Sequence, residues 1–259
     1  MASMSRAIDL NADLGELPGA EGRASDRAIL AEVTSCAIAC GGHAGDAATM
    51  EATLLAAQAH NVLAGAHPSY PDRENFGRRS MAISPEDLHA ALCSQMMQLS
   101  AIADRLGVAL AHIKPHGALY NDAAKIEATA DTVAHAAQSC FGTKLALVGP
   151  PNSETEKAAK RHGLRFFAEG FMDRTYMPDG SLMPRGQDGA VLEDTDARLH
   201  QACLIARDQQ VTDCNGTLLA LPAKTICLHG DSPGAAQTAR LIRTALGVQG
   251  ISVTPMGHG

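Results

Sequence analysis

Short apolar runs alternate with longer segments of helical periodicity along most of the chain. The apolar runs predict strands at 7–11, 36–40, 62–66, 109–114, 145–148, 165–168, 225–228 and 251–254. The segments between them predict helices at 25–34, 46–60, 85–106, 123–139, 152–162, 193–209 and 234–246. Repeated strand–helix units indicate a parallel sheet that is covered on both faces. Seven or eight units in 259 residues predict an α/β fold, a TIM-like (β/α) barrel with seven or eight parallel strands, and a doubly wound open sheet is the alternative.

The boundaries of these helices carry capping residues. The predicted N-terminal caps are Ser25–Asp26, Asp46 and Ser84–Pro85, and the predicted C-terminal caps are Gly107 and Gly163. Two long loops, 67–84 and 170–190, are rich in Gly, Pro, Asp and Arg, and loops of that length are often functional. Because no internal repeat or linker interrupts the pattern, residues 1–259 are expected to form one domain.

Ionisable and polar side chains follow six of the seven main predicted strands, at the carboxyl end of each. They are Asn11, Asp13 and Glu16, then His43 and Asp46, His67, Lys114 and His116, Glu169, and finally His229 and Asp231. In a parallel barrel these ends share one face, and that face carries the active site. Helix capping accounts for residues such as Asp46, but it does not account for the histidines and the lysine. The pattern therefore predicts an active site at this face.

Two of these stretches place polar side chains inside the barrel. In "DLNAD", Asp9, Asn11 and Asp13 point to the same side, and Asp9 is expected to lie deepest and to be structural. In "HIKPH", His112 and Lys114 point inward, and Pro115 ends the strand. His112 has the alternative interpretation of a core group. A buried ammonium needs a partner, and Asp13 or Glu169 is the nearest candidate for Lys114.

The glycine-rich stretch "CGGHAGD" stands directly before a predicted helix. Gly41 and Gly42 allow a close backbone approach, which favours an oxyanion or phosphate cradle beside His43. The alternative is a tight strand-to-helix turn in which Asp46 caps the helix. No GxxxxGK[ST] motif occurs anywhere, so the chain lacks an ordinary ATP cradle of its own.

The two long loops contribute arginines, chiefly Arg73, Arg174 and Arg185. A guanidinium is suited to a carboxylate or a phosphate, so at least one is expected to bind an anionic part of the substrate. Braces that hold the loop shape are the alternative for each single arginine.

The amino-acid composition narrows the classes of molecule that this protein is expected to bind. The net charge of −7 and the aromatic content of 3% argue against nucleic acid, and no apolar run approaches a membrane span. The seven cysteines form no CxxC pair, which disfavours a cysteine-rich zinc site and is typical of reduced thiols. With no signal peptide visible at the start, we expect a cytoplasmic protein.

Six segments together resemble the LamB/YcsF family. They are "IDLNADLGE", "ACGGHAGD", "GAHPSYPDRENFGRR", "HIKPHGALYN", "DRTYMPDGSLMPR" and "CLHGD", and they lie between residues 8 and 231. The resemblance implies a barrel of the glycoside hydrolase/deacetylase type. It also implies the ATP-dependent opening of 5-oxo-L-proline to L-glutamate, together with two partners, the B and C subunits, that handle much of the ATP chemistry. The sequence departs from the family at Gly42, where an aromatic residue is usual.

Hydrolysis of such a lactam requires a base, an acid and groups that stabilise developing negative charge. We assign Asp13 as the base with His43 or His116, Lys114 as the stabiliser, and His229 and Asp231 as a proton relay. The candidates for substrate binding are Asn11, Glu16, Gly41, Gly42, His67, Arg73, His112, Glu169, Arg174, Arg185 and also His229. Two alternatives stay open: a metal-dependent deacetylase or amidohydrolase that uses Asp13 and the histidines, and a noncatalytic protein that delivers the lactam to its partners.

Overall fold

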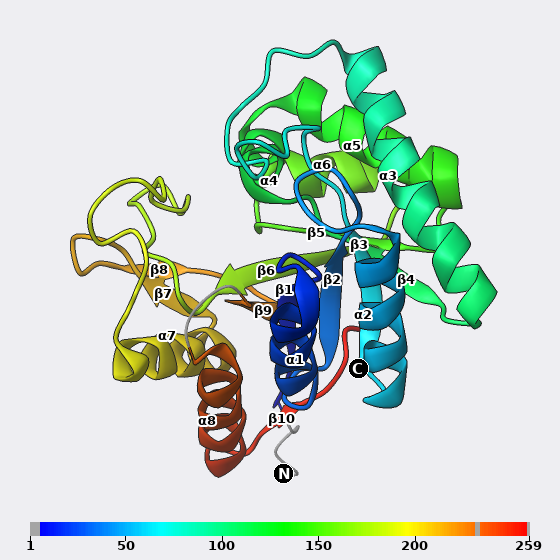
Figure 1. The fold of residues 1–259 in the computed structure, drawn as a ribbon. Helices are drawn as coiled ribbons and strands as arrows, with labels where there is room; N and C mark the ends of the chain where they lie inside the picture. Colours follow the sequence, from blue (N-terminus) through cyan, green and yellow to red (C-terminus); the bar gives the residue numbers. More distant parts are fainter. Residues whose placement is uncertain (1–5, 231–233, 258–259) are drawn as a thin grey trace.

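The computed structural model describes residues 6–230 and 234–257, and seven parallel strands close into a barrel (Figure 1). In order around the barrel these are β1 (Arg6–Leu14), β2 (Ser35–Ala39), β3 (Leu63–His67), β4 (Leu110–Ile113), β5 (Ala146–Gly149), β6 (Phe166–Phe171) and β9 (Thr225–His229). Pairing of β9 with both β6 and β1 closes the ring. The barrel prediction is therefore confirmed, and the open sheet is excluded.

In the part of the chain that the structure describes, three further strands lie outside the closed ring. The last predicted strand appears as β10 (Ile251–Val253), which pairs with the first residues of β1. The sequence pattern missed β7 (Gln210–Thr212) and β8 (Leu218–Ala220), a short antiparallel pair that follows the seventh helix. Both of these strands are only three residues long, which is too short for an alternating pattern to stand out.

Eight helices surround the barrel within the described residues. They are α1 (Gly19–Leu30), α2 (Ala47–Ala59), α3 (Pro85–Leu106), α4 (Gly117–Lys125), α5 (Glu127–Phe141), α6 (Glu154–Arg161), α7 (Thr195–Asp208) and α8 (Ala235–Val248). Helices α3 and α5 pack side by side on the outer surface, as Figure 1 shows. None of the helices in this part of the chain is both long and apolar enough to cross a bilayer.

Local sequence explains where most of these helices begin. The side chains of Asp46 and Ser84 accept hydrogen bonds from backbone N–H groups in the first turns of α2 and α3, and Gly107 ends α3 in the left-handed conformation. The prediction for α1 was wrong, because the helix begins at Gly19. Asp26 lies inside α1, buried, and its carboxylate accepts hydrogen bonds from the Gly15 N–H and the Thr53 hydroxyl. The Asp26 carboxylate, which the sequence pattern predicted to cap a helix, thus makes tertiary contacts instead.

The predicted helix at 123–139 is two helices. Helix α4 begins at Gly117, directly after His116, and α5 begins at Glu127 after a one-residue break. The early start of α4 moves Tyr120 out of a loop and into the first turns of a helix at the barrel mouth.

Candidate functional site

A cavity of about 240 Å³ opens at the carboxyl ends of the strands. Strand ends supply part of its wall: Asp13, His67, Lys114, His116, Phe171 and His229. Helix α4 and the two long loops supply Tyr120, Arg78, Arg174 and Arg185. Its size is near the lower end of small-molecule sites, so the cavity fits a compact ligand rather than a polymer. The predicted active-site face is therefore the face where the cavity lies.

Lys114 lies at the floor of the cavity between two carboxylates. Its Nζ is 2.8 Å from Asp13 Oδ1 and 2.7 Å from Glu169 Oε1, so both predicted partners are confirmed. It also donates to Asn11 Oδ1 at 3.0 Å. Burial alone lowers the pKa of Lys114, but the neighbouring charges, with Asp13 first, raise it well above its usual value. The side chain is therefore a permanent cation and is unsuited to act as a base.

At Asp13, burial and the neighbouring charges change the pKa in the opposite directions to those at Lys114. Burial raises its pKa, but the facing His67 imidazole and the Lys114 ammonium outweigh burial and hold the pKa well below its usual value. The carboxylate lines the cavity and stays ionised near neutral pH. Asp13 therefore retains the charge that a general base needs.

Beneath this pair lies a polar layer that supports it. Asn11 donates to Glu169 Oε1 at 2.9 Å and to the Thr225 hydroxyl at 2.6 Å. Asp9 lies deeper and accepts hydrogen bonds from the hydroxyls of Thr34, Ser35 and Thr225 at 2.5–2.8 Å. The expectation that Asp9 is structural agrees with this position. Asn11 and Glu169 lie behind Lys114 and do not line the cavity.

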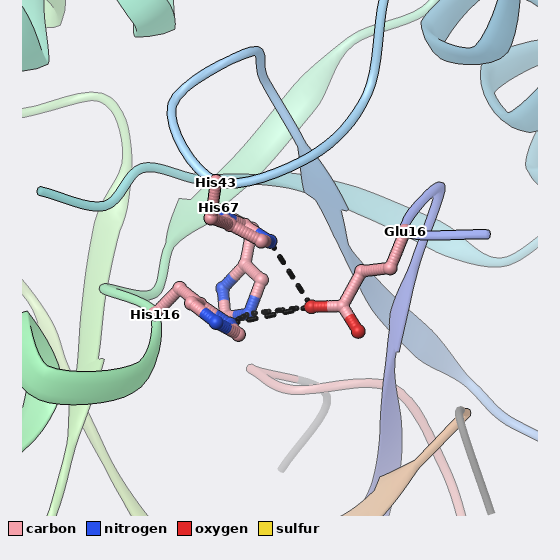
Figure 2. A group of neighbouring side chains, drawn as sticks. All are labelled: Glu16, His43, His67 and His116. Atoms are coloured by element: carbon pink, nitrogen blue, oxygen red, sulfur yellow. Dashed lines mark hydrogen bonds and ion pairs between the residues drawn. The ribbon is translucent and has the colours of Figure 1, made fainter. Parts of the chain in front are cut away.

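Three histidines converge on the Glu16 carboxylate beside the cavity (Figure 2). Glu16 Oε1 lies 3.1 Å from His43 Nε2, 3.3 Å from His116 Nδ1 and 3.8 Å from His67 Nε2. The His43 and His116 rings stack with their centroids 3.6 Å apart. Burial lowers the pKa of His43 to about 2 and holds that of His116 well below its usual value. Imidazole and carboxylate groups in this arrangement are those that hold transition metals.

His229 does not join the other histidines. Its Nδ1 lies 2.9 Å from Asp173 Oδ2, and its backbone N–H donates to the same carboxylate at 3.2 Å. Although burial raises the pKa of Asp173, His229 lowers it below its usual value. The sequence pattern predicted only that Asp173 lies in a long loop. It did not predict the pairing with His229, because no feature of the neighbouring sequence links the two residues. Asp231, the predicted relay partner, lies outside the described residues.

The glycine-rich turn is braced from within the chain. Arg73 donates to the carbonyl oxygens of Gly41 at 3.1 Å and Gly45 at 2.8 Å, and it does not line the cavity. A Cβ atom at Gly42 would overlap the buried side chains of Gln95 and Ser69. The expected cradle of Gly41 and Gly42 is therefore packed against protein, and the turn interpretation with Asp46 as cap describes this segment.

The other predicted residues divide between the cavity and the core. Arg174 lines the cavity and also donates to the carbonyl oxygens of Ala190 and Met183, so it braces its loop as well. Arg185 lines the cavity. His112 is buried away from it, where burial lowers its pKa to about 3. Tyr120 was missed because the sequence pattern started its helix too late, at residue 123 instead of Gly117.

Comparison with known proteins gives consistent matches along nearly the whole chain. Residues 8–259 match the model of the LamB/YcsF family. The chain is 44% identical over 254 residues to a protein of Methylococcus capsulatus that is named as the A subunit of 5-oxoprolinase, covering 98% of this chain and 97% of that protein. It is 46% identical over 247 residues to a protein of the same name from Erwinia tasmaniensis, covering 95% and 98%.

A solved structure supports the same relationship. The lactam utilization protein from Thermus thermophilus superposes with a TM-score of 0.87 at 37% identity, covering 96% of this chain and 100% of that one.

Proposed function

Since the chain belongs to the LamB/YcsF family, we propose that it works as the A subunit of a 5-oxoprolinase, which opens 5-oxo-L-proline to L-glutamate in a reaction coupled to ATP hydrolysis. Support comes from the names of two relatives that are 44% and 46% identical over nearly their full lengths. The name of the superposing lactam utilization protein is consistent with a cyclic amide as substrate.

One observation in the structure carries the proposal: a permanent cation and an ionised carboxylate, Lys114 and Asp13, lie side by side at the floor of a small cavity. When water adds to the lactam carbon in the ATP-coupled reaction, the carbonyl oxygen already carries an anionic phosphoryl group. An ammonium fixed at that position stabilises the charge, and a neighbouring carboxylate accepts the proton of the water. The cavity thus holds a base and a charge stabiliser, two of the three kinds of group that amide hydrolysis requires.

The wall of the cavity suits the rest of the substrate. 5-Oxoproline carries a carboxylate, and Arg78, Arg174 and Arg185 line the cavity. Arg174 and Arg185 lie in the loop between β6 and α7. We assign the substrate carboxylate to these arginines because a guanidinium donates two parallel hydrogen bonds to a carboxylate.

Phosphorylation makes the lactam reactive. The γ-phosphoryl group of ATP is transferred to the carbonyl oxygen, which forms an O–P bond and releases ADP. Water then adds to the carbon, the ring C–N bond breaks, and the nitrogen takes a proton. The resulting acyl phosphate is hydrolysed by a second water to the side-chain carboxylate of glutamate and inorganic phosphate.

A proton donor for the ring nitrogen stands across the cavity. His229 lines the cavity, and its Nδ1 is hydrogen-bonded to the carboxylate of the buried Asp173. The other ring nitrogen, Nε2, is therefore the one available to a substrate. A carboxylate in this position orients the ring and stabilises its protonated form. We assign His229 as the proton donor and Asp173 as the residue that positions it.

The phosphoryl transfer itself is assigned to partners. The chain has no GxxxxGK[ST] motif, and its glycine-rich turn is packed against Gln95 and Ser69. We propose that the B and C subunits of a three-part enzyme bind ATP and that this chain supplies the lactam site.

The test is an assay of ADP and glutamate formation from ATP and 5-oxoproline, with this chain alone, with the B and C subunits alone, and with all three. Formation of both products in equal amounts only with all three supports the proposal. Glutamate formation without ADP would overturn the ATP coupling. Unchanged activity of the complex with Asp13→Asn would assign the chain to lactam delivery instead of catalysis.

A further inference from the structure

The structure assigns a binding site for one divalent transition-metal ion to Glu16, His43, His67 and His116, and we propose Zn²⁺ as the probe that fits it. One ligand atom from each residue lies within 4.8 Å of every other, and all four side chains are almost completely buried. Figure 2 shows the Glu16 carboxylate facing the three rings. The geometry of these four side chains supports the site whatever the identity of the substrate.

Backbone carbonyl groups fix the tautomers of two of the rings. His67 Nδ1 lies 2.7 Å from the carbonyl oxygen of Lys114, and His116 Nε2 lies 3.0 Å from that of Phe76. A carbonyl oxygen only accepts hydrogen bonds, so both of these nitrogens carry hydrogen. In the neutral ring the other nitrogen is then bare, and a carbonyl partner behind a histidine is the usual support of a metal ligand.

The two bare nitrogens face each other. His67 Nε2 and His116 Nδ1 lie 3.0 Å apart, so when both rings are neutral two lone pairs meet at this point. Oxygens of Glu16 at 3.3 Å from His116 Nδ1 and of Asp13 at 3.4 Å from His67 Nε2 also face this point, and both are acceptors. Such a convergence of acceptors requires a cation.

A metal ion satisfies this requirement better than a proton. A single proton joins two acceptors, whereas this point collects nitrogen and oxygen atoms from four side chains. Neutral imidazoles with one carboxylate are ligands that Zn²⁺ takes in four-coordinate sites.

The ion would face the cavity, because His67 and His116 line it and Asp13 lies between the cluster and the Lys114 ammonium. A divalent ion there supplies a Lewis acid next to the carbonyl-binding floor. The amino-acid sequence contains no HExxH motif. The four proposed ligands come from separate segments, so no short motif marks this metal site.

The experiment measures binding without turnover. The full chain is stripped of metal with a chelator, dialysed, and titrated with Co²⁺ and then Zn²⁺, and bound metal is counted by elemental analysis. We expect one ion per chain, d–d absorption of Co²⁺ that Zn²⁺ abolishes, and a higher Tm with Zn²⁺. The affinity for the metal ion should fall at least about tenfold in His67→Ala and in Glu16→Gln. The Gln side chain keeps the shape of the Glu side chain and removes its charge.

Two control variants locate the ion. His60→Ala removes an exposed histidine at the end of α2. The double variant His89→Ala/His135→Ala removes two neighbouring rings, 4.7 Å apart, from a separate surface pocket. Both controls should bind as the wild type does. Loss of the ion in the surface double variant, equal affinity in His67→Ala, or absence of stoichiometric binding to the folded wild-type chain would each overturn the site. The ATP-coupled assay is a separate measurement, so either proposal can fail alone.

Discussion

Lys114 Nζ and Glu169 Oε1 lie 2.7 Å apart inside the barrel, where the two side chains are 2% and 0% exposed. Glu169 is thus an essential partner of the cation that faces the cavity, although it does not line the cavity itself. Removing Lys114 leaves two buried carboxylates without their cation, whereas removing Glu169 leaves the buried ammonium with Asp13 as its one carboxylate partner. Unpaired charge of this kind has a large cost in a protein interior.

The first prediction follows for Lys114→Met. Turnover should fall at least about 100-fold, because the negative charge at the phosphorylated carbonyl oxygen loses its cation. The free energy of unfolding should also fall by about 3–5 kcal/mol, because Asp13 and Glu169 stay buried without their cation. Steady-state kinetics and urea unfolding measure the two effects.

The double variant Lys114→Met/Glu169→Gln separates the two roles of the lysine. It removes the Glu169 carboxylate, which has lost its cation in Lys114→Met. We therefore expect the double variant to recover part of the free energy of unfolding and none of the turnover. Near-normal turnover in either variant would remove Lys114 from the mechanism.

The second prediction concerns the pair of Asp173 and His229, whose atoms lie 2.9 Å apart. Asp173→Asn should lower kcat by about 10²–10⁴-fold with little change in KM, because the amide no longer stabilises the protonated ring or fixes its tautomer. The matched control is Asp179→Asn in the same loop, where the carboxylate accepts hydrogen bonds from the N–H and hydroxyl of Ser181 and does not line the cavity. Equal kcat values for the two variants would show that the pair has no part in proton transfer.

The third prediction concerns pH and the buried Asp9. Burial raises its pKa from 3.8 to about 6, so the folded chain binds this proton more tightly than the unfolded chain does. Its contribution to the free energy of unfolding is therefore fully present below about pH 4 and is lost as the pH rises through about 6. The loss amounts to about 3 kcal/mol at most.

Asp9→Asn removes this titration. The stability of the variant relative to the wild type should increase between about pH 4 and pH 7 in urea unfolding series. Groups that titrate in both proteins, such as Asp13, cancel in this difference. A difference that is constant across that range would show that Asp9 is ionised throughout.

The fourth prediction concerns the packing of Gly65 on β3 against His112 on β4. A Cβ atom at Gly65 would overlap the His112 ring. Gly65→Ala should lower the free energy of unfolding by about 1–3 kcal/mol, because the ring must move within a packed interior.

Two further variants check the cause. Adding His112→Ala should restore part of the stability, because the ring is gone. Gly186→Ala is the control, since a Cβ atom there meets nothing within 4 Å. If the Gly65 and Gly186 variants are equally stable, the contact between Gly65 and His112 does not contribute to stability.

The sequence pattern predicted the parts of this protein that depend on neighbours in the chain. Alternation in "DLNAD" placed Asp9, Asn11 and Asp13 on the inner side of one strand, and all three are buried. The burial cost of an ammonium pointed to Asp13 and Glu169 as partners of Lys114, and both distances agree. Ser84 and Pro85 fixed the beginning of α3 at its observed residue.

Relationships between distant segments could not be predicted in this way. Asp173 and His229 are separated by 56 residues, and no periodic pattern links them. Glu16 was expected to bind substrate, but it lies against three histidines from other strand ends. Asp26 looked like a helix cap because its local sequence suits one, whereas its partners Gly15 and Thr53 come from outside the helix. In each case the deciding contact is made only when the barrel closes.

The closing pair of strands has a consequence for the order of folding. Residues 9–13 of β1 pair with 225–229 of β9, so Asp13 and His229 become neighbours only when segments from the two ends of the chain meet. Such distant pairing is slow because the intervening chain must first be ordered. Catalytic competence should therefore appear in the last kinetic phase of refolding, after most helical signal has returned.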